Sequence, residues 1–515
     1  MGRAKVQRAN RGWNMEETFP PSPPVPGRTR GARVRGGAFW KPVSGRGVYK
    51  PMKHALASLL AVLITPASVL CAAAAPESIR PNVLFIYMDD WGWGDLSCHG
   101  HPYLKTPNLD RLAVEGTDFQ QFNVLSPVCS PSRTAAVTGK FPSRYSIRHA
   151  LGGAEDNRRL NQCDWLDPSV TTTARLFQQA GYATGHFGKW HLGRNPNLRT
   201  ADYGYAESST WAGPEKPDEL GVHGVYEKAI AFLRAHRDQP FYLDLWPHET
   251  HAPQLPSEES MREYAHLDEQ HRPYAASIAD GDKGVGRVLS ALKELGLEQN
   301  TIVLFSSDNG PESTGSEKEK QLRGGYGTYY STGSTGGLRG RKRSLYEGGV
   351  RVPFLVRWPG HTPAGAKNEA TVLTAVDLLP TLCAAAGVPL PGTYQSDGEN
   401  VLEALHGKPF ERTKPVFWDF PAGNGKGLIW ASLAVREGEW KLVMDERAKR
   451  RELYRVVEDR AEAQEISGQH LETVERLTKM ALDWKASLPA APDPACCSQA
   501  KPGKARNARK PDAGE

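Results

Sequence analysis

Stretches of strand character alternate with helical stretches along most of the chain. Short runs bounded by turn residues predict strands at residues 82–88, 119–124, 183–187, 241–246, 301–307 and 352–357. Helical patterns predict helices at residues 108–115, 129–138, 172–180, 226–236, 273–295 and 372–386. Such alternation is typical of an α/β fold in which helices cover both faces of a mainly parallel sheet.

The pattern changes after about residue 415. Two strand-like runs at 430–435 and 440–444 flank Glu437-Gly438-Glu439 and predict a hairpin, and a final helix is expected at 471–485. This region therefore predicts a smaller antiparallel C-terminal subdomain beside the α/β domain.

The N-terminal region contains the pattern of an export signal. Met52-Lys53-His54 precedes the apolar run Ala55–Ile64, which is followed by Pro66 and a stretch of small residues. This order predicts a secretory signal peptide cleaved after Ala74, and hence a periplasmic, secreted or other extracytoplasmic location. The run is too short for a stable membrane span, and Pro66 interrupts it. A lipoprotein anchor at Cys71 is the alternative.

Composition and charge narrow the class of protein. The 515 residues carry a net charge of +6, but residues 1–51 contribute eleven basic and two acidic residues, so the body is mildly acidic. A body of that sign argues against nucleic-acid binding. Seven cysteines are too few for a disulfide scaffold. We expect residues 1–51 to be an extension that is disordered or outside the working protein, and residues 52–74 to be the signal peptide. The α/β domain is expected at 75–414, the C-terminal subdomain at 415–488 and a disordered tail at 489–515.

Two oxygen-rich clusters follow predicted strands. Asp89-Asp90 comes directly after the strand at 82–88, and Asp308-Asn309-Gly310 comes after the strand at 301–307. Ligands in open parallel sheets bind beyond the carboxyl ends of the strands, so the clusters can converge. Three carboxylates and one amide oxygen suit Ca²⁺ or Mg²⁺ and lack soft ligands for zinc. Alternatively, both clusters are ordinary turns.

A cysteine stands at the predicted start of the helix at 129–138. Pro131 fits a first helical turn, so Cys129 lies at a helix N-terminus, where an anion is favoured, and Arg133 faces the same end. Cys129 is alternatively a small buried apolar residue, or a thiolate nucleophile paired with a histidine.

The segment Cys129-Ser-Pro-Ser-Arg133 resembles the Cys-x-Pro-x-Arg signature of type I, formylglycine-dependent sulfatases. Six further segments match that family in sequence order, within a similarity that runs from about residue 81 to 460: 89–95, 106–110, 134–140, 188–193, 308–310 and 346–349. The resemblance implies an alkaline-phosphatase-like α/β fold and hydrolysis of sulfate esters.

The resemblance also implies the cofactors. A maturation enzyme would oxidise Cys129 to formylglycine, whose hydrate has one hydroxyl to attack sulfur and a second to expel sulfate. The metal, usually Ca²⁺ rather than Mg²⁺, would be held by Asp89, Asp90, Asp308 and Asn309, together with the modified Cys129.

The remaining site residues are assigned by the same resemblance. Lys189 and Lys342 would bind sulfate oxygens, His191 would take a proton as sulfate leaves, and His251 would be the general acid for the leaving group, with His248 as a close competitor. In an extended segment the spacing of two places Lys189 and His191 on one side. Without that context, such residues are better explained as a solvated lysine and a structural histidine in a loop. Arg133 would anchor the modified residue and the metal ligands, and Arg339 and Arg343 are expected to be solvated.

The favoured function is a calcium-dependent sulfatase acting on a sulfated carbohydrate or aryl sulfate. Tryptophans near the motifs could stack on sugar rings, although loop tryptophans equally often serve packing. A phosphate or phosphonate ester hydrolase of the same superfamily is the first alternative. A non-enzymatic glycan-binding or calcium-binding protein is the second, if Cys129 is never converted.

Overall fold

The computed structural model describes residues 80–193, 195–211, 224–421 and 430–498. The expected extension at 1–51, the expected signal at 52–74 and the last 17 residues of the expected tail lie outside the described residues. Among the helices of the described residues, none is long and apolar enough to cross a membrane.

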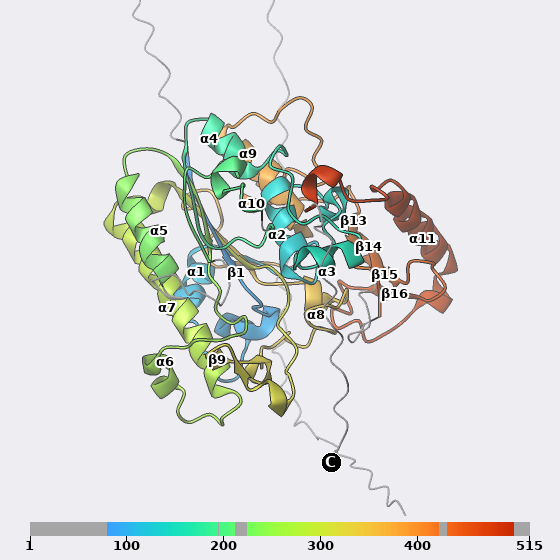
Figure 1. The fold of residues 1–515 in the computed structure, drawn as a ribbon, viewed down its shortest axis with the longest axis horizontal. Coiled ribbons are helices and arrows are strands. Elements are labelled where there is room, and N and C mark those ends of the chain that lie inside the picture. The colour runs from blue at the N-terminus through green and yellow to red at the C-terminus, as the bar shows by residue number, and fades with distance from the viewer. Residues whose placement is uncertain (1–79, 194, 212–223, 422–429, 499–515) are drawn as a thin grey trace, which may run out of the picture. The chain divides into compact units, whose positions relative to one another are not determined.

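An eight-stranded sheet forms the centre of the structure (Figure 1). Its order is β11-β2-β10-β7-β1-β6-β4-β5, and the five strands from β7 to β5 are parallel. The parallel strands span Thr301–Ser307 (β7), Asn82–Met88 (β1), Phe241–Trp246 (β6), Ala183–Lys189 (β4) and Glu207–Trp211 (β5). The other three strands span Ala366–Asn368 (β11), Thr117–Phe119 (β2) and Phe354–Arg357 (β10). The mainly parallel α/β fold is thus confirmed, with β10 antiparallel to both neighbours.

Strand β1 places the core on both faces of the sheet. Val83, at the strand's start, pairs with Tyr242 of β6 and Ile302 of β7, and every residue of β1 is buried. Side chains alternate along a strand, so Val83, Phe85 and Tyr87 join one apolar cluster and the residues between them join another. This two-sided burial explains why the strand is a continuous apolar run.

Helices cover both faces (Figure 1). One apolar cluster includes α2, α4 and α9, which span Cys129–Thr138, Thr173–Gln179 and Leu378–Ala386. The other includes α1, α5 and α7, which span Pro107–Glu115, Gly224–Ala235 and Arg272–Glu294. The shorter helices α3, α6, α8 and α10 span Ala154–Arg159, Glu258–Glu263, Glu347–Val350 and Leu402–Leu405.

Two expected elements are divided in the structure. The helix expected at 372–386 begins only at Leu378, because Leu373–Thr374 forms strand β12 and the Asp377 carboxylate accepts the Thr374 N–H at 2.7 Å. The strand expected at 119–124 is interrupted between β2 and β3, which spans Phe122–Asn123. Polar capping and sheet pairing thus overrule the apolar pattern in both places.

The C-terminal region is a four-stranded antiparallel sheet with one long helix, as expected. Strands β13 to β16 pair in chain order and span Val416–Asp419, Leu433–Glu437, Trp440–Met444 and Arg451–Arg455, and α11 spans Leu471–Ala486. The predicted hairpin is present, and Gly438 adopts a positive φ of 58° in its turn. The described chain continues past Leu488 to Ser498, and Cys496 O accepts the Asp164 N–H at 2.8 Å.

A buried ionic network joins the C-terminal sheet to α8. The Lys441 ammonium of β15 lies 2.7 Å from Glu347 Oε1 and 3.2 Å from Glu462 Oε1, and all three side chains are fully buried. Burial raises the pKa of Glu462 to about 7, even beside Lys441. Burial opposes ionisation of Glu347 as well, but Lys441 and two buried arginines hold its pKa at about 2.

Candidate active site

The acidic side chains after β1 and β7 converge at the carboxyl edge of the sheet. Carboxylate oxygens of Asp89, Asp90 and Asp308 and the Cys129 sulfur all lie within 4.8 Å of one another, and all four residues are buried. β1 and β7 are adjacent and parallel, so their ends deliver both pairs to one point. The structure therefore brings together the residues expected to hold the metal.

The donor set fits a hard divalent cation. Asn309 Nδ2 donates to Asp90 Oδ1 at 2.7 Å, while the buried Asn309 Oδ1 has no hydrogen-bond partner among the described residues. A buried carbonyl oxygen without a partner is costly and needs an explanation. Together with three buried carboxylates, it forms the kind of oxygen cage that Ca²⁺ or Mg²⁺ occupies.

Backbone geometry holds these side chains in place. Asp90 has a positive φ of 66°, which turns the chain sharply as β1 ends. A Cβ on Gly310 would lie 1.9 Å from Gly348 O, so only glycine fits where this loop passes α8. The Asp308 N–H donates to Met88 O at 3.1 Å and joins the two loops.

Cys129 occupies the first turn of α2 as expected. Its sulfur lies 3.5 Å from Asp89 Oδ1 and 3.4 Å from the Lys189 ammonium. Burial, reinforced by the negative charge of Asp308, raises the pKa of the Cys129 thiol. The unmodified side chain therefore retains its proton and is a poor thiolate nucleophile.

Arg133 lies fully buried behind the acidic cluster. Its Nε and Nη2 donate to Asp308 Oδ2 at 2.9 and 2.7 Å, and its Nη1 donates to Lys189 O at 3.3 Å. Nη2 is also 3.6 Å from Asp89 Oδ1. The guanidinium lies 5.0 Å from the centre of the Trp246 ring, which gives it a cation–π contact. Arg133, which is excluded from solvent, thus orients the carboxylates of Asp308 and Asp89.

Two lysines flank the cluster. The ammonium of Lys189, the last residue of β4, lies 2.6 Å from Asp89 Oδ2, and that of Lys342 lies 2.6 Å from Asp90 Oδ2. Burial would lower the pKa of each lysine, but the carboxylates beside them raise both pKa values overall. Both side chains therefore remain positively charged within a buried site.

His191 reaches the site by a route that differs from the expected extended segment. Strand β4 ends at Lys189, and His191 has a positive φ of 52°. The turn still directs both side chains to one cavity, and His191 Nε2 lies 3.1 Å from Leu151 O. Burial, with the nearby charge of Lys189, lowers the pKa of His191 well below its usual value.

Two histidines follow β6, and their rings lie 4.8 Å apart. His251 Nδ1 lies 2.8 Å from Ala252 O, and His248 Nδ1 lies 2.7 Å from Asp89 Oδ2. The contact of His248 with a candidate metal ligand was not foreseen, because the sequence offers no pattern that pairs residues 89 and 248. Burial lowers the pKa of both histidines.

The basic run at 339–343 is more engaged than expected. Arg339 and Arg343 are exposed, as expected. Arg343 nevertheless forms a bidentate ion pair with Glu312, and the Arg339 guanidinium stacks 3.8 Å from the centre of the Tyr346 ring. Glu312 also lies 3.6 Å from the Lys342 ammonium. The buried Glu312 follows the Asp308-Asn309-Gly310 turn, so it attracts arginine and lysine from this run.

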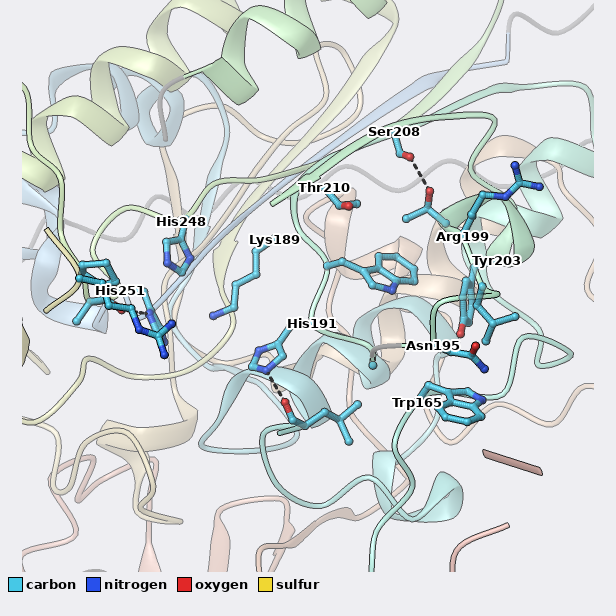
Figure 2. Close-up of a pocket in the computed structure, with 18 of the residues that line it drawn as sticks. Trp165, Lys189, His191, Asn195, Arg199, Tyr203, Ser208, Thr210, His248 and His251 are labelled. Atoms are coloured by element: carbon cyan, nitrogen blue, oxygen red, sulfur yellow. Dashed lines mark hydrogen bonds between the residues drawn. The ribbon is translucent and has the colours of Figure 1, made fainter. Parts of the chain in front are cut away.

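A cavity of about 780 Å³ opens above the site (Figure 2). Lys189, His191, His248 and His251 line one end, and Trp165, Tyr203 and Arg199 lie at the other. Its volume falls within the range of about 300–1,000 Å³ that is typical of small-molecule sites. The cavity has room for a group much larger than sulfate.

Comparisons with known proteins place this chain in one family. A family model described as Sulfatase matches residues 81–388, and one described as N-sulphoglucosamine sulphohydrolase, C-terminal, matches residues 340–485. The chain therefore belongs to the sulfatase family. As expected from the sequence, it is a sulfuric ester hydrolase.

Individual relatives agree. Human arylsulfatase A is 32% identical over 428 residues, which cover 73% of this chain and 77% of the relative. Dog N-acetylgalactosamine-6-sulfatase is 29% identical over 472 residues, covering 82% of each chain. Among solved structures, Ps i-CgsB matches with a TM-score of 0.68 and 24% identity, covering 79% of this chain and 92% of that one, which supports the fold.

Proposed function

We propose that this protein hydrolyses sulfate esters of carbohydrates, using Ca²⁺ and a formylglycine made from Cys129. The observation that carries the proposal is the position of the Cys129 sulfur, within 4.8 Å of three buried carboxylates. The buried Cys129 thiol keeps its proton and is a poor nucleophile without modification. Its position beside the candidate metal ligands is nevertheless the position that a nucleophile would need. The relatives named as sulfatases support the same reading.

The bound groups would supply the chemistry that side chains lack. Asp89, Asp90, Asp308 and Asn309 would hold a calcium ion, which would supply charge to neutralise sulfate oxygens. A formylglycine hydrate at position 129 would supply one hydroxyl to attack sulfur and a second to release the sulfate.

The chain's own residues would position and neutralise the ester. Lys189 and Lys342 hold its sulfate oxygens, because both ammonium groups are buried and charged. Sulfate binding places an anion beside His251 and raises its pKa, so the imidazolium can donate a proton to the leaving oxygen. His191 accepts a proton as sulfate departs, since its low pKa leaves it neutral before substrate binds.

The substrate class and the route to the site complete the proposal. We infer a sulfated sugar, because the cavity has room for one and N-acetylgalactosamine-6-sulfatases are relatives of this chain. Export through the signal at 52–74 and conversion by a maturation enzyme would precede activity. A phosphate or phosphonate ester hydrolase is disfavoured by the family match. A non-enzymatic glycan-binding role is left if Cys129 is not converted.

The test uses the exported protein co-produced with a maturation enzyme. Mass spectrometry of the tryptic peptide that contains Cys129 should show the mass loss of conversion from thiol to aldehyde. The protein should then cleave 4-methylumbelliferyl sulfate far better than the matching phosphate, and chelation should abolish turnover. Cys129→Ala should be inactive, whereas Cys98→Ala, at a partly buried cysteine outside the site, should retain turnover. Full activity of Cys129→Ala would overturn the mechanism.

A further inference from the structure

A short hairpin forms part of the outer wall of the cavity. Strands β8 and β9 span Gln321–Leu322 and Gly325–Tyr326. Gln254 and Tyr326 exchange two backbone hydrogen bonds, at 2.8 and 3.0 Å, which fasten the hairpin to the segment after His251. A Cβ on Gly325 would lie 2.7 Å from Gln254 O, so the hairpin lies directly on this segment.

The turn of the hairpin contains an unusual arginine. Arg323 and Gly324 are its two central residues, with positive φ angles of 46° and 88°, as in a type I′ turn. That conformation is strained for a residue other than glycine, and Asn or Asp usually occupies it. The turn conformation therefore does not explain why an arginine occupies position 323, and a conformational outlier of this kind points to a functional role.

The surroundings of Arg323 leave its charge uncompensated. Its exposed side chain lines the cavity together with Leu322 and Pro253, and among the described residues it forms no ion pair. By contrast, Lys320 on the same loop lies 3.3 Å from Glu269. The described residues that line the cavity include no carboxylate. A positive wall of this kind raises the local concentration of anions.

We propose that Arg323 determines specificity by binding a second anionic group of the substrate, a sulfate or a carboxylate, on the leaving-group side next to His251. The inference rests on the proposed function, because the scissile sulfate is taken to lie between Lys189 and His251. A guanidinium suits either group, since its planar fork donates two parallel hydrogen bonds. Among the described residues, Arg199 is the other arginine that lines the cavity, and it lies at the opposite end from His251 (Figure 2).

The sharpest variant is Arg323→Asn. It removes the guanidinium but produces Asn-Gly, the pair that type I′ turns favour. The thermal midpoint of this variant should therefore equal or exceed that of the wild type, which separates loss of charge from loss of the hairpin. Lys318→Ala removes an exposed charge from the same loop outside the cavity lining and is the matched control.

Paired inhibitors measure the effect and distinguish the two anions. N-acetylgalactosamine 6-sulfate is compared with its 4,6-disulfate, and a uronate-containing 6-sulfated disaccharide is compared with its carboxyl-reduced form. Each inhibition constant is measured against 4-methylumbelliferyl sulfate. In the wild type, at least one dianion should bind about five- to tenfold more tightly than its monoanionic partner, and this advantage should fade at high salt. Arg323→Asn should abolish the advantage, and Lys318→Ala should keep it.

Several outcomes would overturn the inference. It is overturned if the wild type prefers neither dianion, if Arg323→Asn keeps the preference, or if Arg199→Ala removes it in place of Arg323→Asn. Failure of the proposed function looks different, because the matured wild type would then not cleave 4-methylumbelliferyl sulfate. In that case the same four ligands are compared by calorimetry, and the ratios of their dissociation constants decide the inference independently.

Discussion

Replacing Arg133 by lysine tests how the site is held together. Arg133→Lys keeps the buried charge but loses the fork that gives Asp308 two hydrogen bonds and reaches Lys189 O. One lost bond to a carboxylate costs about 1.5–3 kcal/mol and one to a carbonyl about 1 kcal/mol, so we expect a loss of roughly 2–4 kcal/mol in unfolding free energy. Because Arg133 orients two carboxylates of the candidate metal site, calcium affinity should fall about 10–100-fold.

Two measurements follow these effects separately. Urea unfolding in the presence of a chelator reports the unfolding free energy without metal, and a calcium titration of sulfatase turnover reports affinity. Arg144→Lys is the matched control, because Arg144 forms a comparable fork with Asp397 at 2.7 Å, but at a site that is one-third exposed. It should cost at most about 1 kcal/mol and leave the calcium titration unchanged. Equal losses in the two variants, or an unchanged calcium requirement in Arg133→Lys, would refute the reasoning.

Three further predictions concern other parts of the structure. His251→Ala should lower turnover of alkyl sulfates by about 10²–10³ and that of aryl sulfates, whose leaving groups need less protonation, by much less; equal losses would exclude His251 as the acid. Gly310→Ala should lower the free energy of unfolding by about 1–3 kcal/mol and disrupt calcium-dependent turnover, because the added Cβ would strike Gly348 O. The control Gly392→Ala should have little effect on either, because a Cβ there would meet nothing within 4 Å. The pKa of Glu462 is about 7 in the folded protein against 4.5 when free. Its favourable contribution to the free energy of unfolding is therefore complete below about pH 4.5 and is lost as the pH rises through 7. Glu462→Gln should therefore gain stability relative to the wild type between pH 5 and 8, by up to about 3 kcal/mol; parallel melting profiles would contradict this.

The strands that build the site were predictable because their burial is simple. β1, β6 and β7 match the expected bounds, since each lies in the sheet interior and reads as one apolar run between turn residues. The start of α2 at Cys129 was also predictable, because Pro131 fits only the first turn of a helix. The antiparallel direction of β10 was not, because side-chain burial is the same in either direction.

Contacts between distant segments were the least accessible to sequence reasoning. The pairing of His248 with Asp89 depends on how β6 and β1 end side by side, and no local pattern encodes it. The ion pair between Glu312 and Arg343 has the same origin. His191 was expected beside Lys189 in an extended segment, whereas a left-handed turn directs its ring to the cavity that Lys189 also lines.

The link between Lys441 and Glu347 has a consequence for anyone who wishes to shorten this protein. Glu347 begins the turn of α8 whose Gly349 O accepts the Gly310 N–H at 3.0 Å, one residue beyond the candidate ligand Asn309. A chain ending before β15 would lack Lys441, the positive group nearest to Glu347, and would leave this buried carboxylate to the more distant Arg351 and Arg436. The C-terminal quarter of the polypeptide thus supports the loop that carries Asn309. A shortened protein that contains only residues 81–388, the range of the Sulfatase family model, would lack this support.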